Sequence, residues 1–204
     1  MSLIAEAQKL AHFVTSLDDF EIQTRSPQTY QHMGAIITDS ILQAGLNYKA
    51  VVAPRVHRLI EQYPKASTTD GFLDVIETYG LNSILNWSHP EKPQRIHKLA
   101  LFFHQHHIDT EDVLKYWLQE SKNWKLLLEI KGIGPKTVDY LKMLVRLQSV
   151  AVDRHIRTFI KIAGLTYTRY EDIQQVVEFA ADILSLDRNS FDLSIWSYIS
   201  TQQR

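Results

Sequence analysis

Residues 126–138 have the sequence Leu126-Leu127-Leu128-Glu129-Ile130-Lys131-Gly132-Ile133-Gly134-Pro135-Lys136-Thr137-Val138. An apolar helical segment runs here into Gly-Ile-Gly, and a proline follows at a position suited to the first turn of a second helix. Two glycines around one apolar residue permit a tight turn and let the backbone approach another molecule closely. We expect Ile133 to pack between the two helices. The stretch therefore predicts two helices joined by a short hairpin, over about residues 122–148.

The start of the second helix is a candidate anion site. The first N–H groups of a helix have no partner within it, and the helix dipole favours negative charge there. A phosphate bound through backbone amides is held without regard to base sequence. The candidate DNA-binding residues of this hairpin are Lys131, Gly132, Ile133 and Gly134.

Charge is distributed unevenly along the chain. The net charge is −1, but nine Lys and Arg residues against three Asp and Glu residues give +6 between residues 122 and 161, which leaves −7 elsewhere. A local basic region on an acidic protein is typical of a phosphate-binding surface. Ordinary solvated helix faces would give the same pattern.

The rest of the chain predicts an all-α fold. Glycine and proline are few, 7 and 6 of 204 residues, and apolar residues recur at helical spacing in one segment after another. Pro54 should kink or divide the helix over residues 48–63, while Thr69 and Asp153 are candidate N-caps. The other expected helices lie near residues 3–17, 30–45, 69–79, 93–107, 110–118, 122–130, 135–147, 153–163, 170–186 and 191–201.

Several classes of protein are disfavoured. The chain has no cysteine, which excludes disulfides, thiolate zinc sites, cysteine nucleophiles and iron–sulfur clusters. The first residues lack a signal peptide, and no apolar run approaches the roughly 20 residues that cross a bilayer. His104, His106 and His107 lie next to one another near a helix end, where they spread over different faces, so no metal site is expected. The sequence predicts a monomeric cytoplasmic protein, nucleoid-associated in a prokaryote, with no membrane partner.

A second stretch, Val150-Ala151-Val152-Asp153-Arg154-His155-Ile156, accompanies the hairpin. Together the two stretches, and the spacing between them, resemble the endonuclease III-like DNA glycosylases, the HhH-GPD superfamily, over about residues 126–164. The resemblance implies a base-excision repair enzyme that binds double-stranded DNA containing a damaged base through a helix-hairpin-helix. It also implies two helical subdomains with a cleft between them, formed by residues 27–148 and by residues 1–26 with 149–204.

The resemblance identifies Lys136 and Asp153 as the catalytic pair, facing each other across that cleft. The residue matching Lys136 attacks C1′ of the damaged nucleotide and forms a Schiff base that permits strand cleavage, and the residue matching Asp153 assists base loss. A helix dipole disfavours positive charge at Lys136 and so favours the neutral amine. A fixed carboxylate beside the sugar stabilises the positive charge that develops as the base leaves. A phosphate-contacting lysine and a purely structural cap are the alternatives, and His155 is expected to pack or hydrogen-bond near the cap.

A third stretch, Asp39-Ser40-Ile41-Leu42-Gln43, is similar to a segment of the adenine-mismatch glycosylases. A nucleotide must leave the base stack to be excised, and Gln43 is a candidate to fill the gap. Asp39 is a candidate secondary acid that protonates the departing base. The alternative for both is a polar position on an amphipathic helix.

The chain departs from most of the superfamily in lacking the four-cysteine cluster. That places it nearer the cluster-free 8-oxoguanine glycosylase/lyases, so 8-oxoguanine is the first substrate to consider and no cofactor is expected. A monovalent cation held by hairpin carbonyls is compatible with the resemblance. The alternatives are a monofunctional glycosylase, a non-catalytic DNA-binding module and an all-helical interaction protein. The candidates for stacking on a flipped base, each more often a core residue, are Trp117, Trp124, Trp196 and Tyr198.

Overall fold

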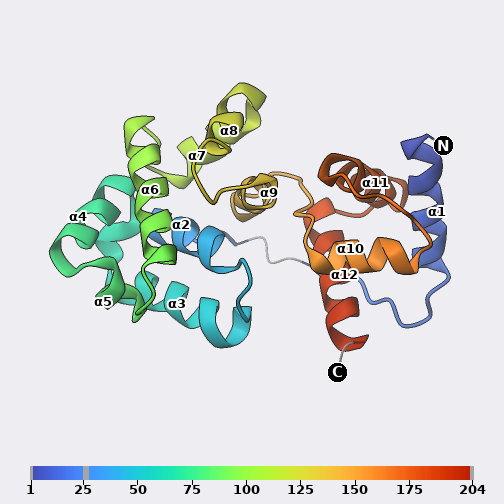
Figure 1. The fold of residues 1–204 in the computed structure, drawn as a ribbon, viewed down its shortest axis with the longest axis horizontal. Helices are drawn as coiled ribbons and strands as arrows, with labels where there is room; N and C mark the ends of the chain where they lie inside the picture. Colours follow the sequence, from blue (N-terminus) through green and yellow to red (C-terminus); the bar gives the residue numbers. More distant parts are fainter. Residues whose placement is uncertain (1, 25–27, 203–204) are drawn as a thin grey trace. The chain divides into compact units, whose positions relative to one another are not determined.

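The computed structural model describes residues 2–24 and 28–202, and this part of the chain contains helices and no strand. It confirms the all-α fold. The chain forms two compact units (Figure 1). Each unit has its own hydrophobic core. Unit 2 is the continuous segment 28–147, and unit 1 combines the described residues before position 28 with those from 148 onward. The predicted subdomain boundary at residues 26 and 27 lies outside the described residues.

Unit 2 contains the helices α2 to α9. Their bounds are α2 Met33–Leu42, α3 Ala53–Gln62, α4 Thr69–Tyr79, α5 Leu81–Leu85, α6 Glu91–Gln105, α7 Glu111–Gln119, α8 Ser121–Leu127 and α9 Pro135–Leu144. A π-helical turn at Tyr48–Val52 precedes α3, and a 3-10 turn at Pro64–Ser67 precedes α4.

The centre of unit 2 is α2, in which every residue is buried. A helix that is apolar nearly all round belongs in a core, and α3, α4, α6 and α9 all pack against this one. His32 caps its N-terminus, because Nδ1 accepts from the Ala35 N–H at 3.1 Å. Nε2 therefore carries the proton and donates to the Tyr63 carbonyl at 3.1 Å. Burial lowers the pKa of His32, against the opposing effect of backbone contacts with Tyr63 and with His32 itself.

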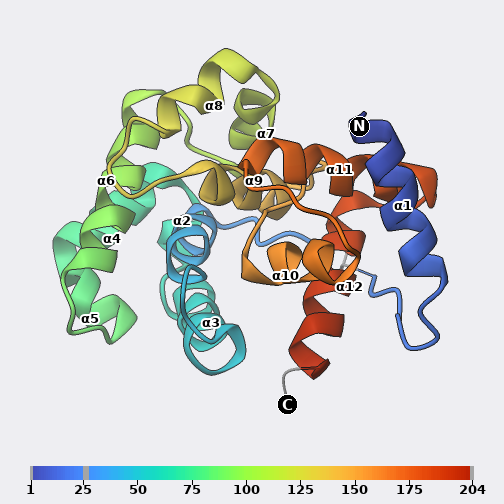
Figure 2. The ribbon, with the colours of Figure 1, turned by 45° about the vertical axis from the view of Figure 1, so that its right-hand side comes forward.

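Unit 1 is built from helices at both ends of the chain: α1 Leu3–Thr15, α10 Arg154–Ile162, α11 Tyr170–Ile183 and α12 Arg188–Gln202. Helix α1 lies along α11, and α10 lies along α12 (Figure 2). Aromatic rings fill the space among them, with Phe20 centred 5.5 Å from both Phe159 and Tyr198. Apolar burial of this kind holds the two ends of the chain together.

The segment over residues 48–63 is divided near Pro54, as predicted: a π-helical turn, Tyr48–Val52, is followed by α3, which has Pro54 in its first turn, where a missing N–H is not needed. Local predictions differ from the structure at two other places. The cap of α4 is Thr68, whose hydroxyl accepts from the Gly71 N–H at 3.0 Å. Thr69, predicted to be this cap, is buried and donates to the Ile108 carbonyl at 2.6 Å. The prediction of Thr69 was therefore wrong by one residue, and the short helix α5 was not expected.

No helix among residues 2–24 and 28–202 is both long and apolar enough to cross a membrane.

Candidate functional site

The turn between α8 and α9 places the glycine-rich stretch at the surface of unit 2. Ile133 is buried in the core of this unit, and its N–H donates to the Ile130 carbonyl at 2.9 Å. Gly132 has a φ of +92°, a conformation that favours glycine, and Lys131 beside it is exposed. The turn therefore directs Ile133 inward and its polar neighbour outward.

Two residues of this turn have no free backbone N–H group to offer to a bound anion. Because Ile133 donates within the turn and Pro135 has no N–H, neither contributes an amide to a bound anion. The Ile130 carbonyl is already the acceptor of this N–H, and the monovalent cation that is compatible with the resemblance stays a prediction.

Lys136 is the second residue of α9, one position after the proline that begins the helix. Its Nζ donates to Gln43 Oε1 at 2.8 Å, although the two residues are 93 positions apart in the chain. Gln43 is the C-cap residue of α2, and its Nε2 donates to the Ser40 carbonyl at 3.4 Å. The fold of unit 2 therefore brings together two of the residues predicted for the site.

Asp39 lies one helical turn before Gln43 and is fully buried. Its Oδ2 accepts from the Tyr30 hydroxyl at 2.8 Å and from the Tyr48 hydroxyl at 3.3 Å. Its Oδ1 accepts from the hydroxyl of Tyr140 at 3.3 Å. Burial, and next the negative charge of Asp39, raise the pKa of Tyr30 far above its usual value. We call Asp39 with its three tyrosines the tyrosine cluster.

Helices α2 and α9 are therefore joined by two side-chain contacts. Lys136 on α9 bonds Gln43 at the C-terminal end of α2, and one turn later in α9 and one turn earlier in α2, Tyr140 bonds Asp39. Residues four apart lie on the same face of a helix, so both pairs lie along one line where the helices meet. The two contacts set which turn of α9 faces which turn of α2.

Lys92 on α6 adds a second cation beside this pair. Its Nζ donates to the Ile41 carbonyl at 2.7 Å and to the Ala44 carbonyl at 2.9 Å, on either side of Gln43. A lysine at the C-terminal end of a helix interacts favourably with the dipole and the unpaired carbonyls. Burial lowers the pKa of Lys92, and the charges of Arg95 and Lys136 lower it further, against the effect of Glu91.

Asp153 belongs to unit 1, where it caps α10. Its Oδ1 accepts from the N–H groups of His155 and Ile156 at 2.8 and 3.1 Å. Its Oδ2 pairs with His155 Nδ1 at 2.8 Å, and that ring stands 6.0 Å from the Trp196 ring. The side chain is 20% exposed. Asp153 is thus a partly exposed carboxylate held in one orientation, and His155 has the supporting role expected for it.

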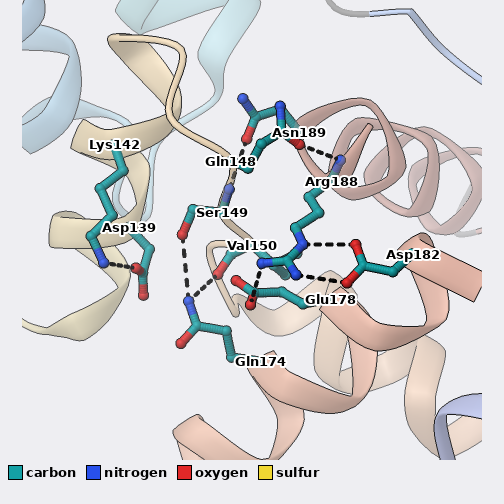
Figure 3. Close-up of polar contacts among 10 residues, drawn as sticks. All are labelled: Asp139, Lys142, Gln148, Ser149, Val150, Gln174, Glu178, Asp182, Arg188 and Asn189. Atoms are coloured by element: carbon teal, nitrogen blue, oxygen red, sulfur yellow. Dashed lines mark hydrogen bonds and ion pairs between the residues drawn. The ribbon is translucent and has the colours of Figure 1, made fainter. Parts of the chain in front are cut away.

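The extended segment before Asp153 is held by side chains of unit 1. The Ser149 N–H donates to Asn189 Oδ1 at 3.2 Å, and Gln174 Nε2 donates to the Val150 carbonyl at 3.1 Å (Figure 3). The Ala151 N–H donates to Asp192 Oδ2 at 3.0 Å. A segment without helical or sheet partners still has its backbone groups satisfied. The position of Asp153 in its unit therefore depends on α11 and α12.

Arg188 fixes the start of α12, next to this segment. Its guanidinium bonds Asp182 Oδ2 at 2.7 Å and Glu178 Oε2 at 2.8 Å, and its N–H donates to Gln148 Oε1 at 2.9 Å (Figure 3). The contact with Asp182 raises the pKa of Arg188 and lowers the pKa of Asp182. A guanidinium shared by two carboxylates is a rigid bridge between helices.

Sequence reasoning missed five residues that contact Asp39, the end of α2 or the hairpin: Tyr30, Tyr48, Lys92, Arg95 and Tyr140. Arg95 lies against Gly132 and forms an ion pair with Glu91. Tyr140 alone carried a signal, because it lies four residues after Lys136 and so on the same helix face. The other four come from elements that nothing in the sequence pattern connects to the hairpin.

The aromatic residues predicted as candidates for stacking on a flipped base lie in different environments. Trp117 packs against Phe102 with ring centroids 5.9 Å apart, and Lys142 Nζ lies 4.3 Å from the Trp124 ring. Lys142 also pairs with Asp139 at 2.9 Å (Figure 3). Tyr198 is partly buried against the core of unit 1, while Trp196 is 36% exposed. Among the described residues, no group of three or more His, Asp or Glu side chains is placed to hold a metal ion.

Comparison with known proteins gives one family. The family model described as Domain of unknown function (DUF8548) matches residues 8–200, which includes both units. No curated protein matches the chain.

Proposed function

The chain belongs to the DUF8548 family, and we propose that it is a DNA glycosylase with AP lyase activity that excises a damaged or mismatched base from duplex DNA. The observation that carries the proposal is the lysine amine in the first turn after the Gly-Ile-Gly hairpin, held by Gln43 from a distant helix. A positioned amine is a nucleophile for C1′ of a nucleotide. Oxidised guanine is the first substrate to test.

The hairpin is the proposed phosphate-binding element. Gly134 is extended, and a Cβ built there meets no atom within 4 Å, so its surface is open to a ligand backbone. Lys131 is exposed beside it, and Arg95 lies against Gly132. A glycine that allows close approach, flanked by two cations, suits a phosphate. Such contacts supply affinity for duplex DNA without reading its sequence.

The proposed reaction begins at Lys136. The amine nitrogen forms a bond to C1′ while the bond from C1′ to the base breaks, and the base leaves with that electron pair and takes up a proton. Opening of the sugar ring then gives an imine between Lys136 and C1′. Loss of a proton from C2′ expels the 3′ phosphate with its electron pair, which cleaves the strand. Each of these steps needs the neutral amine at the start.

Asp153 is proposed to stabilise the positive charge that develops on the sugar. Because two backbone N–H groups and a histidine hold the carboxylate, it requires little rearrangement when that charge appears. The contacts of Asp39 favour a different role. A buried carboxyl group that accepts from three hydroxyl groups is held in one place between the helices, so Asp39 is suited to organising the site.

The test is covalent trapping with borohydride. The full chain is incubated with duplexes that contain 8-oxoguanine, an oxidised pyrimidine, uracil or an abasic site, and adducts are separated by electrophoresis. We expect an adduct that disappears in Lys136→Gln and persists in Lys98→Gln, a matched change at an exposed position of α6. The duplex that traps best identifies the substrate. Base release without an adduct would instead indicate a monofunctional glycosylase, and DNA binding without base release a non-catalytic module.

A further inference from the structure

Helix α10 of unit 1 carries all of its lysine and arginine side chains on one face. Arg154, Arg157 and Lys161 are exposed, and the helix contains no acidic residue. At 3.6 residues per turn, the three positions fall within an arc of about 60° around the helix axis. The buried residues of α10 lie on the opposite side: His155, Ile156, Phe159 and Ile160. The three cations therefore form one row that faces away from the core of unit 1, and we call this row the α10 stripe.

Charge in unit 1 is separated between helices. Helix α11 has the acidic residues Glu171, Asp172, Glu178 and Asp182 and no lysine or arginine. The ion pairs that the described residues of unit 1 form leave out the α10 stripe. An ordinary solvated surface mixes both signs of charge. A row of cations without paired carboxylates instead creates a positive potential that attracts a polyanion.

We propose that the α10 stripe binds the phosphates of duplex DNA, as a second DNA-binding surface in addition to the hairpin of unit 2. This inference rests on the proposed function, which supplies the partner. At 1.5 Å per residue, positions 154 and 161 lie about 10 Å apart along the helix axis, close to the rise of about three nucleotides of one DNA strand. The stripe therefore has the length to contact a row of phosphates.

The side chains of the stripe have the donors that phosphate requires. A guanidinium presents five N–H donors in one plane and can bond two oxygens of a phosphate, while a lysine supplies a point charge. Arg157 uses one donor group within the protein, because Nη1 bonds the Thr168 carbonyl at 3.1 Å. This contact anchors the guanidinium and leaves other donors for a phosphate. Contacts to phosphate carry no base information, so the stripe adds affinity without a sequence preference.

The stripe begins one residue after Asp153, the carboxylate proposed to act beside the sugar. Phosphate contacts fix the register and the orientation of a protein on DNA. Because the cap and the stripe belong to the same short helix, phosphates bound along the stripe would determine which sugar Asp153 meets. The α10 stripe is thus suited to positioning Asp153 on the strand as well as to holding the DNA.

The experiment is a salt titration of DNA binding. The full chain is titrated into a labelled undamaged duplex, and fluorescence anisotropy gives the affinity at several salt concentrations. Each phosphate contact contributes about 0.9 to the slope of log affinity against log salt. The combined variant Arg154→Gln, Arg157→Gln and Lys161→Gln should therefore bind with a slope smaller by about 2–3. Glutamine is a good helix former, and thermal melting of the variant verifies that the fold is kept.

Two controls separate the stripe from charge in general. The variant Lys49→Gln, Lys65→Gln and Lys98→Gln removes the same charge from exposed positions of unit 2, and its slope should stay near that of the wild type. The variant Arg154→Lys with Arg157→Lys keeps the charge of the stripe. It should retain the slope of the wild type but bind more weakly, because lysine lacks the planar fork of donors.

An α10 variant with the salt slope of the wild type overturns the proposal. An equal decrease in both glutamine variants overturns it as well, because overall charge would then explain the effect, and so does a wild type that does not bind the duplex. Borohydride trapping decides the glycosylase proposal separately. A smaller slope in the α10 variant without any adduct from the wild type would leave the DNA-binding surface and remove the enzyme, whereas an adduct with an unchanged slope would remove the stripe alone.

Discussion

Replacing Gly134 with alanine separates folding from DNA binding at the hairpin, with Gly132→Ala as the matched change two residues away. Gly134 is extended, with φ −116° and ψ 178°, and an added Cβ meets nothing within 4 Å. Alanine there should leave the fold intact and stabilise it by about 0.4–1 kcal/mol through the unfolded chain. Gly132 has a φ of +92°, and a Cβ would meet the Arg95 side chain. Alanine there should destabilise unit 2 by about 1–2 kcal/mol.

Calorimetry and a DNA-binding titration measure the two effects. Roughly 2–4 °C of melting temperature corresponds to 1 kcal/mol in a chain of this size, so Gly132→Ala should melt several degrees lower and Gly134→Ala slightly higher. If the backbone at Gly134 touches a phosphate, the added methyl group should weaken duplex binding by about tenfold, the loss of one charge-assisted hydrogen bond. A Gly134→Ala protein that binds duplex DNA as the wild type does, over a range of salt concentrations, would refute the close approach at the hairpin.

Three further predictions concern groups that stabilise one unit or the other. Because burial lowers the pKa of His32, the contribution of His32 to the free energy of unfolding is complete above about pH 6.5 and is lost as the pH falls from there. His32→Asn keeps a cap and should flatten this fall of the unfolding free energy at acid pH, measured by urea titrations. The raised pKa of Tyr30 makes its contribution complete below about pH 10 and lost as the pH rises further. Tyr30→Phe should remove that alkaline slope and cost about 1 kcal/mol at neutral pH, and an unchanged slope would contradict the assignment. Asp153→Ala should destabilise unit 1 by about 1–2 kcal/mol in thermal melts, whereas Asp153→Asn should retain the cap and most of the stability but trap less abasic DNA.

Structural features that depend on a few neighbouring residues were predicted well from the sequence. The Gly-Ile-Gly-Pro run led to a turn with Ile133 buried and a helix that starts at Pro135, and Asp153 caps α10 as expected. These features depend on backbone geometry and on hydrogen bonds between near neighbours, which residue type determines directly. The cap of α4 was predicted at Thr69 instead of Thr68 because residue type alone does not distinguish the two. Two adjacent threonines offer the same hydroxyl, and only the contact of Thr69 with Ile108 decides between them.

The surroundings of Lys136 could not be predicted, because they depend on how α2, α6 and α9 pack. Gln43 and Lys92 reach the site from helices distant in sequence, and no periodicity shows which turns will meet. The sequence marked Asp39 as polar but did not indicate that three tyrosines would surround it. Helix α5, five residues long, is too short to show a helical period. The pairing of Lys136 with Asp153, which lie in different units, stays a prediction.

The pairing of α1 with α11 gives the chain an order of assembly during synthesis. Unit 2 is one continuous segment, so all its helices are available once residue 147 has left the ribosome. Helix α1 emerges before that unit, and its partner α11 follows about 150 residues later. At about 5–20 residues per second, the apolar face of α1 waits on the order of ten seconds or more for its partner. Leu10 and Val14, which are buried in the finished protein, are therefore apolar residues that a chaperone could bind on the nascent chain during this interval.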